Sequence, residues 1–363
     1  MTSPKPRARD LGIPFEGSPG PMNAITDVDG VTVGHVTLVS GEGKLIVGQG
    51  PVRTGLTAIL PRGNAGCARV FAGYFSLNGN GEMTGTHWVE ESGLLEGPIM
   101  LTNTHSVGIV RDAVIEWQIT KAKMEQPWAL PVVAETFDGY LNDINGFHVR
   151  KPHVFEAIEN ACPGPVAEGN TGGGTGMICH EFKGGIGTAS RRLDEKTGGY
   201  TVGVLVQANH GLRHDLRIVG VPAGMEIREN LVKSKEEGSI IIVVATNAPL
   251  MPHQLKRLAR RAALGLGRTG SIGSNFSGDI FLAFSTANAT AAVAQDIVQL
   301  TMVPTEQLDP IFDSTVSATE AAIFNAMVAA ETMIGQDDHK VIAIPHDRLC
   351  EVMKKYGRLM KDE

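Results

Sequence analysis

The stretch Gly238-Ser-Ile-Ile-Ile-Val-Val-Ala-Thr246 decides how the rest of this sequence is interpreted. Five consecutive β-branched residues, Ile240 to Val244, predict a strand that is buried on both of its faces. A charged segment, residues 233–237, comes immediately before this stretch. Ser239 is therefore expected at the point where a solvated loop enters the core of the protein.

A cut at the Gly238-Ser239 peptide bond would give this strand an unusual first residue. Ser239 would then carry a hydroxyl and a free α-amine, which titrates near pH ~8 and can take the hydroxyl proton without a histidine. Glycine suits the preceding position because a strained peptide needs backbone angles that other residues avoid. A plain loop-to-strand junction fits the same residues, so the local pattern leaves both interpretations open.

Composition limits the classes of protein to consider. The 363 residues are 42% hydrophobic and 20% charged, which is typical of a soluble globular protein. The chain could hold one large domain or two, and nothing marks a boundary between two. A net charge of −7 argues against nucleic-acid binding, and no stretch of ~20 apolar residues indicates a membrane span. Four cysteines without CxxC spacing suit reduced thiols in the cytoplasm.

Strands and helices alternate irregularly along the chain. Helices are predicted at 110–120, 154–160, 252–264, 288–302 and 314–333, with Gly265-Leu-Gly267 closing the third of them. Many strands with helices grouped in runs indicate a layered α+β domain in which two stacked sheets lie between helical layers. The loop Asn78 to Gly85 imitates a phosphate-binding loop but lacks Gly-Lys-Ser/Thr, so no nucleotide site is expected there.

A serine nucleophile needs supporting groups, and two segments supply suitable residue types. Ser277 and Asp279 are two apart in an extended segment, so their side chains point the same way and could relay a proton. Asn209 ends an apolar strand and could donate a hydrogen bond to an oxyanion. Each also has a plain interpretation, a capping Ser-Gly-Asp turn in the first case and a turn asparagine in the second.

Substrate binding and metal binding give different signals in this sequence. Glu135 closes a predicted strand and could hold a substrate ammonium, while Phe137 could wall the pocket; a surface turn is the alternative. Eleven histidines invite a metal, but His210 and His214, four apart, are separated by Gly211, which makes a helix doubtful. We therefore expect no metal and no other cofactor. The sequence has no Gly-x-Ser-x-Gly elbow before a helix, which is the motif that would indicate a Ser-His-Asp triad.

The same segments resemble one known family, the L-aminopeptidase/D-amidase/D-esterase (DmpA) and β-aminopeptidase family. The resemblance runs in the family's order through nearly the whole chain. It is carried by Asp27-Val-Asp-Gly-Val-Thr-Val-Gly-His35, Pro131-Val-Val-Ala-Glu-Thr-Phe-Asp-Gly139, Val204-Leu-Val-Gln-Ala-Asn209, Gly238 to Leu250, Leu255-Lys-Arg-Leu-Ala-Arg-Arg-Ala262 and Ser277-Gly-Asp-Ile-Phe-Leu-Ala-Phe-Ser-Thr-Ala-Asn288.

This resemblance implies a fold and a maturation event. The fold implied is a single domain over residues 1–363, an αββα four-layer sandwich similar to N-terminal-nucleophile hydrolases but with different connectivity. Self-cleavage would give a larger chain, 1–238, and a smaller chain, 239–363, and the two-chain protomers would form a homotetramer. The activity implied is that of a serine aminopeptidase acting on small peptides, amino-acid amides or esters, with no cofactor.

Site roles follow by position in the resemblance. Ser239 would be both the self-cleavage residue and the nucleophile, supported by Ser277 and Asp279, where some relatives have glutamate. Asn209 would line the oxyanion hole, Glu135 would bind the free amine of the substrate, and Phe137 would tune specificity. Asn247 stands where many relatives have aspartate, a change that we interpret as peripheral although it could alter processing.

Two other classes of function stay open from the sequence. One is acyl transfer in the same sandwich, as in ornithine acetyltransferase-like proteins; these use threonine as the nucleophile, so Ser239 counts against it. The other is a binding protein that never matures. An acyl-donor assay separates the first from hydrolysis, and an intact chain with an unreactive Ser239 would indicate the second.

Overall fold

Two large sheets organise the computed structural model, which describes residues 5–63, 67–122, 124, 126–232, 238–293 and 296–360. The first sheet has the order β1 (Thr32–Ser40), β2 (Val52–Leu60), β5 (Ile99–Asn103) and β6 (Val132–Thr136). The second has the order β4 (Leu94–Leu95), β3 (Val70–Ser76), β12 (Ile280–Ser285), β11 (Ser239–Thr246), β10 (Thr201–Asn209) and β9 (Gly185–Arg192). Two short hairpins, β7 (Ile178–Cys179) with β8 (Phe182–Lys183) and β13 (Met333–Ile334) with β14 (Lys340–Val341), complete the strands.

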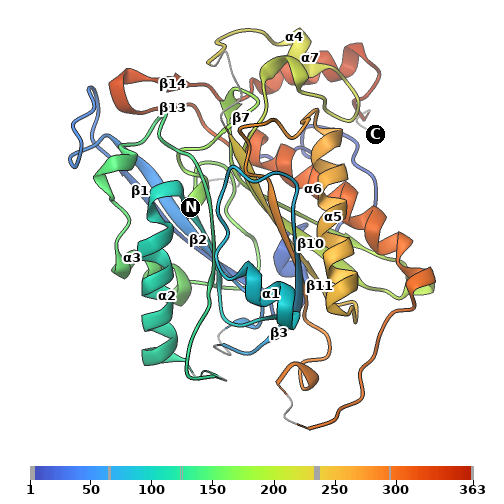
Figure 1. Ribbon diagram of the computed structural model, residues 1–363. Helices are drawn as coiled ribbons and strands as arrows, with labels where there is room; N and C mark the ends of the chain where they lie inside the picture. The colour runs from blue at the N-terminus through green and yellow to red at the C-terminus, as the bar shows by residue number, and fades with distance from the viewer. Residues whose placement is uncertain are drawn as a thin grey trace.

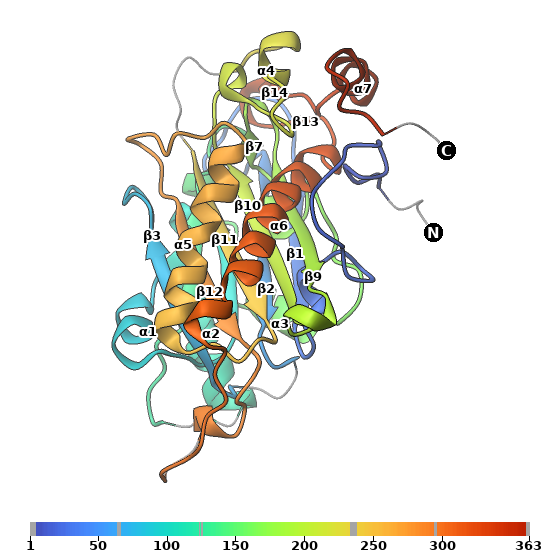
Figure 2. The ribbon, with the colours of Figure 1, turned by 90° about the vertical axis from the view of Figure 1, so that its right-hand side faces the viewer.

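Helices cover the outer face of each sheet (Figures 1 and 2). Helices α2 (Val107–Lys121) and α3 (Lys151–Glu159) pack on the first sheet, and α5 (Pro252–Arg268) and α6 (Asp309–Val328) pack on the second. The other α-helices of the described residues are α1 (Thr86–Ser92), α4 (Ala223–Glu226) and α7 (His346–Lys355). The predicted αββα sandwich is confirmed. Among the described residues, no helix has both the length and the apolar character needed to cross a membrane.

Strand β11 lies inside the second sheet and is buried along its whole length. Ile240, Ile242 and Val244 pack into the core beneath α5 and α6, whereas Ile241 and Val243 pack into the core between the two sheets. Alternate side chains of a strand point to opposite faces, so an unbroken apolar run is what a strand in this position requires. The strand predicted from this run is confirmed.

The predicted end of α5 is wrong. The helix continues through Gly265 to Arg268. An added Cβ at Gly265 would lie 2.6 Å from the carbonyl oxygen of Val316 in α6. Gly265 is therefore needed where two helices approach closely, and it does not end the helix. A sequence alone does not separate these two uses of glycine.

The helix predicted at 288–302 is also wrong over its described part. A single short turn, Ala291–Val293, is helical there, and Ile297 is fully exposed. Asn288 donates its side-chain amide to the Thr301 carbonyl (2.9 Å) and accepts from the Thr301 N–H (3.1 Å). These two bonds close the base of an arm that leaves the body of the molecule (Figure 2). An alanine-rich segment forms a stable helix mainly when it has a face to bury, and residues 296–302 of this arm are exposed.

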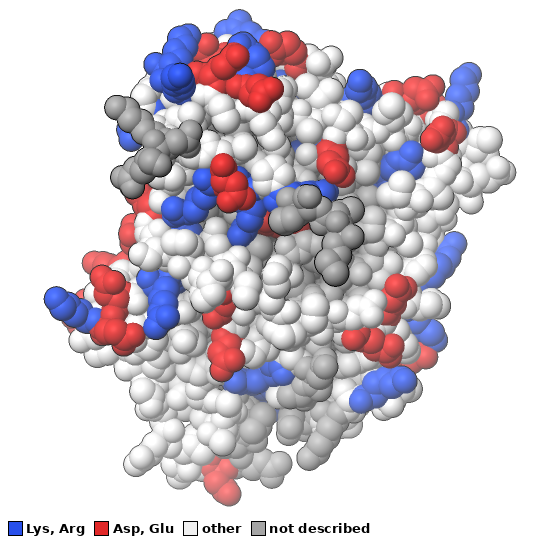
Figure 3. Space-filling view, turned by 180° about the vertical axis from the view of Figure 1, so that it is seen from behind, with Lys and Arg blue, Asp and Glu red and all other residues white. Residues whose placement is uncertain are grey.

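Charged side chains of both signs are interspersed on the face shown in Figure 3. Elsewhere in the described residues, charged side chains pair across long sequence distances, including Arg7 with Glu168 at 2.7 Å and Arg69 with Glu96 at 3.0 Å. Such mixing differs from the basic stripe that nucleic-acid binders display. The absence of nucleic-acid binding stays a prediction.

Close packing of α6 on β9 gives a test of the fold. An added Cβ at Gly187 would lie 2.0 Å from the Ala322 carbonyl oxygen. We expect Gly187→Ala to lower the free energy of unfolding by about 1–3 kcal/mol, the usual cost of overpacking, as measured by denaturant unfolding. Gly108→Ala in α2 is the control, since nothing lies within 4 Å of that position. Equal stability of the two variants would contradict the close approach.

Candidate active site

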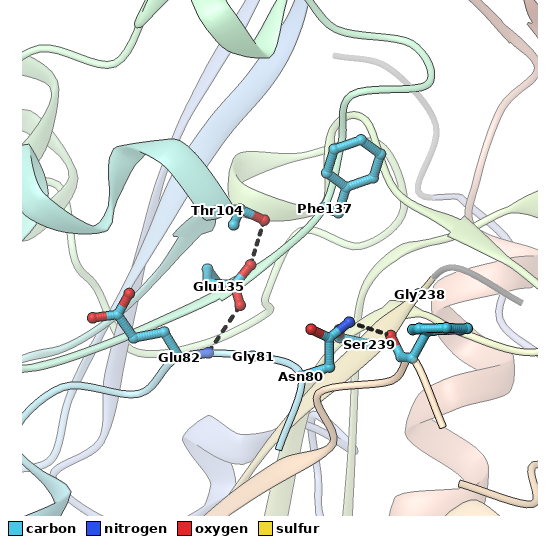
Figure 4. A pocket seen from close by; sticks show the side chains of 9 residues that line it. Asn80, Gly81, Glu82, Thr104, Glu135, Phe137, Gly238 and Ser239 are labelled. Atoms are coloured by element: carbon cyan, nitrogen blue, oxygen red, sulfur yellow. Dashed lines mark hydrogen bonds between the residues drawn. The ribbon is translucent and has the colours of Figure 1, made fainter. Parts of the chain in front are cut away.

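A cavity of about 630 Å³ lies where the carboxyl ends of β5 and β6 meet the beginning of β11. It brings together Ser239, Glu135 and Phe137, three of the residues singled out in the sequence. Its lining consists of Asn80, Gly81, Glu82, Thr104, Glu135, Phe137, Gly238, Ser239 and Phe276. Figure 4 shows Glu135 and Ser239 both beside the loop that carries Asn80 and Gly81.

Ser239 is the first residue of β11 and is 6% exposed. Its Oγ accepts a hydrogen bond of 3.0 Å from the N–H of Gly278. The two neighbours of Gly278 are joined, because Ser277 Oγ donates to Asp279 Oδ1 at 2.6 Å. The N–H of Ile240 donates to the same oxygen at 3.2 Å. The prediction that Ser277 and Asp279 point the same way is confirmed, and both lie against the start of β11.

The loop after β3 holds this group in place, which the sequence did not indicate. Asn78 accepts from the N–H of Asp279 (2.6 Å) and donates its amide to Asp279 Oδ2 (2.8 Å). Asn80 donates its amide to the carbonyl of Phe276 (2.8 Å). With the Ser277 and Ile240 bonds, the Asp279 carboxylate accepts three hydrogen bonds, so its orientation is fixed. The Asn-Gly-Asn-Gly spacing of this loop shows a turn, but its partners are some 200 residues away and leave no local signal.

Glu135 forms the facing wall and is 3% exposed. Its Oε1 accepts from the N–H of Glu82 at 3.0 Å, and Thr104 Oγ1 donates to its Oε2 (Figure 4). Burial raises the pKa of Glu135 above its usual value, while the hydrogen bonds from Thr104 and Glu82 lower this pKa and so limit the rise. A buried carboxylate at a cavity wall favours a cationic partner. Phe137 is 42% exposed and offers an apolar surface beside it.

Asn209 lies directly opposite Ser239 in the β10–β11 pair. Its amide donates to the carbonyl of Phe137 at 2.9 Å, and its Oδ1 accepts from the N–H of Ile178 at 2.7 Å. Asn209 is absent from the described cavity lining and sits behind it. These bonds connect the end of β6, the start of β7 and the strand beside the serine. The oxyanion role of Asn209 therefore stays a prediction.

Gly238 is required for a reason that differs from the one given by the sequence. Its φ lies outside the left-handed region, so unusual backbone angles do not explain it. An added Cβ would instead lie 1.9 Å from the carbonyl oxygen of Asn209. Gly238 thus allows the chain to pass close to β10 immediately before Ser239.

Residues 227–232 are anchored before the chain reaches this point. Arg213 donates from Nη1 to the carbonyls of Ile227 and Glu229, both at 3.1 Å. Glu181 Oε1 accepts from the N–H of Val232 at 3.2 Å. The charged stretch 233–237 lies outside the described residues. The chain is therefore held on both sides of that stretch.

Asn247, where the resemblance leads us to expect aspartate, lies at the other end of β11 from Ser239. Its Oδ1 accepts a hydrogen bond of 2.8 Å from the N–H of Thr201. The eight residues of β11 separate it from the cavity, at roughly 3.3 Å per residue. Its placement supports the interpretation of the change as peripheral.

Comparisons with known proteins agree with this geometry. The model of "Peptidase family S58" matches residues 23–341. A β-peptidyl aminopeptidase (BapA) of Sphingosinicella microcystinivorans is 54% identical over 98% of this chain and 93% of its own length, and one of Sphingosinicella xenopeptidilytica is 50% identical over 96% and 91%.

Solved structures extend the likeness to the fold. The L-aminopeptidase D-Ala-esterase/amidase of Ochrobactrum anthropi, described as a variant of the Ntn hydrolase fold, is 51% identical with a TM-score of 0.90, covering 98% of this chain and all of its own. A Burkholderia β-aminopeptidase is 47% identical with a TM-score of 0.89, covering 97% and 99%. These structures confirm the predicted likeness to N-terminal-nucleophile hydrolases.

The environment of Glu135 gives a test that needs no substrate. Thr104→Val keeps the side-chain shape and removes a hydrogen bond that lowers the pKa of Glu135. We expect this pKa to rise further above the usual glutamate value, as followed by carbon NMR of the labelled carboxyl group. Thr84→Val, whose hydroxyl donates to the Pro131 carbonyl instead, is the control. An unchanged Glu135 titration in Thr104→Val would contradict the assigned contact.

Proposed function

This chain belongs to peptidase family S58 and is an aminopeptidase, and on that premise we propose that it cleaves itself before Ser239 and then uses Ser239 as its nucleophile. The observation that carries the proposal is the position of Ser239. It is the first residue of a buried strand, it faces the cavity, and Gly238 lies on its amino side. A cut there would leave a free α-amine beside the hydroxyl that needs a base.

Self-cleavage needs no group from outside the chain except water. Ser239 Oγ attacks the carbonyl carbon of Gly238, the C–N bond breaks, and the acyl group moves from nitrogen to oxygen as an ester. Water then hydrolyses this ester, which leaves a carboxylate on Gly238 and an α-amine on Ser239. Contacts on both sides of the stretch 233–237 support this step because they restrict where the scissile carbonyl can lie.

The mature enzyme would repeat the same chemistry on a substrate. The α-amine of Ser239 takes the hydroxyl proton while Oγ attacks the substrate carbonyl, and the proton passes to the departing amine or alcohol. Water attacks the acyl-enzyme and releases the amino acid. The N–H of Gly278, 3.0 Å from Oγ, helps to orient the hydroxyl. The side-chain amide of Asn209 is the proposed donor to the oxyanion, and its hydrogen bonds with Phe137 and Ile178 hold it in one orientation.

Ser277 and Asp279 would support the proton transfers. Ser277 Oγ donates a hydrogen bond to Asp279 Oδ1, and the same oxygen accepts a second one from the N–H of Ile240. This arrangement places a carboxylate and a hydroxyl beside the main chain of Ser239. An ammonium that forms there during catalysis would be stabilised by the negative charge of Asp279.

Glu135 would choose substrates that have a free amino group. Its carboxylate lies in the same cavity as Ser239, and hydrogen bonds from Thr104 and Glu82 hold it in one orientation. Substrates would be small peptides, amino-acid amides or esters with L-, D- or β-aminoacyl groups. The names of the relatives, β-peptidyl aminopeptidase and L-aminopeptidase D-Ala-esterase/amidase, support this range. Phe137 would contact the side chain of the bound residue.

Two properties of the assembled protein belong to the proposal. We expect two-chain protomers that form a homotetramer, which sedimentation measures. We expect a cytoplasmic location as well, because four cysteines without CxxC spacing suit a reducing compartment.

Ser239→Ala tests the shared role of the serine. We expect one uncut chain of 363 residues by mass spectrometry and a loss of aminopeptidase activity of at least about 10⁴-fold, as for nucleophile removal in other serine hydrolases. Ser239→Cys is the matched control, because a thiol can perform both the self-cleavage and the attack. A cleaved and active Ser239→Ala protein would rule the proposal out.

Glu135→Gln tests the amine site separately from the nucleophile. Removing one charge-assisted interaction of about 1.5–3 kcal/mol should lower kcat/KM by roughly 10- to 150-fold for esters with a free amino group. Esters of the matching acid without the amino group should react at an unchanged rate, and self-cleavage should proceed. An equal loss for both kinds of ester would show that Glu135 acts on the structure and not on the amine.

A further inference from the structure

Three potential metal ligands meet outside the cavity that contains Ser239. Cys179 ends β7, His180 begins the turn between β7 and β8, and His210 directly follows β10. Their ligand atoms all lie within 4.8 Å of one another, and the three side chains are at most 1% exposed. The N–H of His180 donates to the carbonyl of His210 at 2.7 Å, which ties the two segments together.

We propose that Cys179, His180 and His210 bind a zinc ion. One thiolate and two imidazoles are a ligand set that zinc prefers over calcium or magnesium, and three protein ligands leave one position of the tetrahedron for water. Cys179 Sγ and His210 Nδ1 are 3.9 Å apart. Two ligands of a tetrahedral zinc ion are about 3.5 Å apart for the usual Zn–S and Zn–N lengths, so a small contraction completes this pair.

The backbone holds the ring of His180 toward that of His210. His180 and Glu181 both have positive φ, 47° and 60°, as the two central residues of a type I′ hairpin turn require. Such angles are uncommon for residues other than glycine, although histidine adopts them more often than most. Arg213 stabilises the turn by donating to the carbonyls of His180 (2.9 Å) and Glu181 (2.7 Å). The two imidazole rings stand edge to face with centroids 5.1 Å apart.

The hydrogen bonds of the two rings suit metal ligation. His180 Nδ1 lies 3.0 Å from the carbonyl of Leu212. A carbonyl only accepts, so Nδ1 carries the proton and Nε2 presents its lone pair, which is the usual arrangement of a ligating histidine. His210 Nδ1, which lies 3.9 Å from Cys179 Sγ, is the ligand atom of the second ring.

Nearby charges permit a cation at this position. The amine of Lys183 donates to the backbone carbonyls of Gly174, Met177 and Gly184. The negative charge of the Glu181 carboxylate offsets the positive charge of the Arg213 guanidinium. Ionised Cys179 would supply the negative charge that the site needs.

This site would stabilise the region behind the cavity. His210 follows Asn209, whose side chain spans the end of β6 and the start of β7. Zinc would therefore fix the hairpin to the end of β10, one strand away from Ser239. All three ligands precede residue 238, so binding does not depend on cleavage of the chain or on aminopeptidase activity.

Cobalt(II) gives a spectroscopic test on the full chain. After treatment with a chelator under reducing conditions, the protein is titrated with cobalt. We expect one equivalent bound per chain, with a thiolate-to-cobalt charge-transfer band that one equivalent of zinc abolishes. Zinc should also raise the Tm. Cys179→Ser should lose the band and the zinc-dependent rise in Tm, whereas Cys162→Ser, at an exposed cysteine, should keep both.

Two results would overturn the site. Failure of the wild-type protein to take up either cobalt or zinc would overturn the site. This result needs no variant, so the test remains decisive even if Cys179→Ser folds poorly. A charge-transfer band that persists in Cys179→Ser would place the metal elsewhere. His214→Gln, at an exposed histidine four residues beyond His210, controls for metal on the surface and should leave the band unchanged.

Discussion

Burial of β11 on both faces is the constraint on which the rest of the structure depends. Each fully buried isoleucine or valine of this strand contributes roughly 1.5–3 kcal/mol relative to exposure. Burial of the run from Ile240 to Val244 therefore fixes the position of β11 in the sheet. One face meets the inter-sheet core and the other meets the core under α5 and α6. Ser239 begins this strand, so its position is set by the packing of the whole sandwich.

Hydrogen bonds complete what the apolar packing begins. Asn78 holds Asp279, Asp279 accepts from Ile240, and Gly278 donates to Ser239. These residues come from three segments distant in the chain. On the other side, Glu181 anchors Val232. A chain end at 238 would be six residues from that anchor and hence within about 20 Å of it, so a new terminus would stay near the cavity.

The sequence predicted well the features that depend on local pattern. The apolar run predicted β11, and the grouping of strands and helices predicted the layered sandwich. Ser277 and Asp279 were paired correctly because residues two apart in an extended chain share a face. Family resemblance, more than spacing, brought Glu135 and Ser239 to one site, and the shared cavity agrees with it.

Features that depend on contacts between distant segments were missed. Gly265 and Gly238 were interpreted through backbone angles, but each is needed because another segment passes close by. The segment 288–302 has helical composition, but its described residues 296–302 are exposed and bury no helical face. Asn78 looked like part of a turn, and its contact with Asp279 spans 201 residues. Cys179 and His210 likewise meet only because β7 lies beside the end of β10, and no spacing rule finds such a pair.

The mass of the denatured protein, taken shortly after mixing with a slowly hydrolysed amino-acid ester, tests the central claim most directly. The expected result is two species: an unmodified chain of residues 1–238, and a chain of residues 239–363 that carries one aminoacyl group on Ser239. A single species of 363 residues, or an acyl group on the larger chain, would contradict the account.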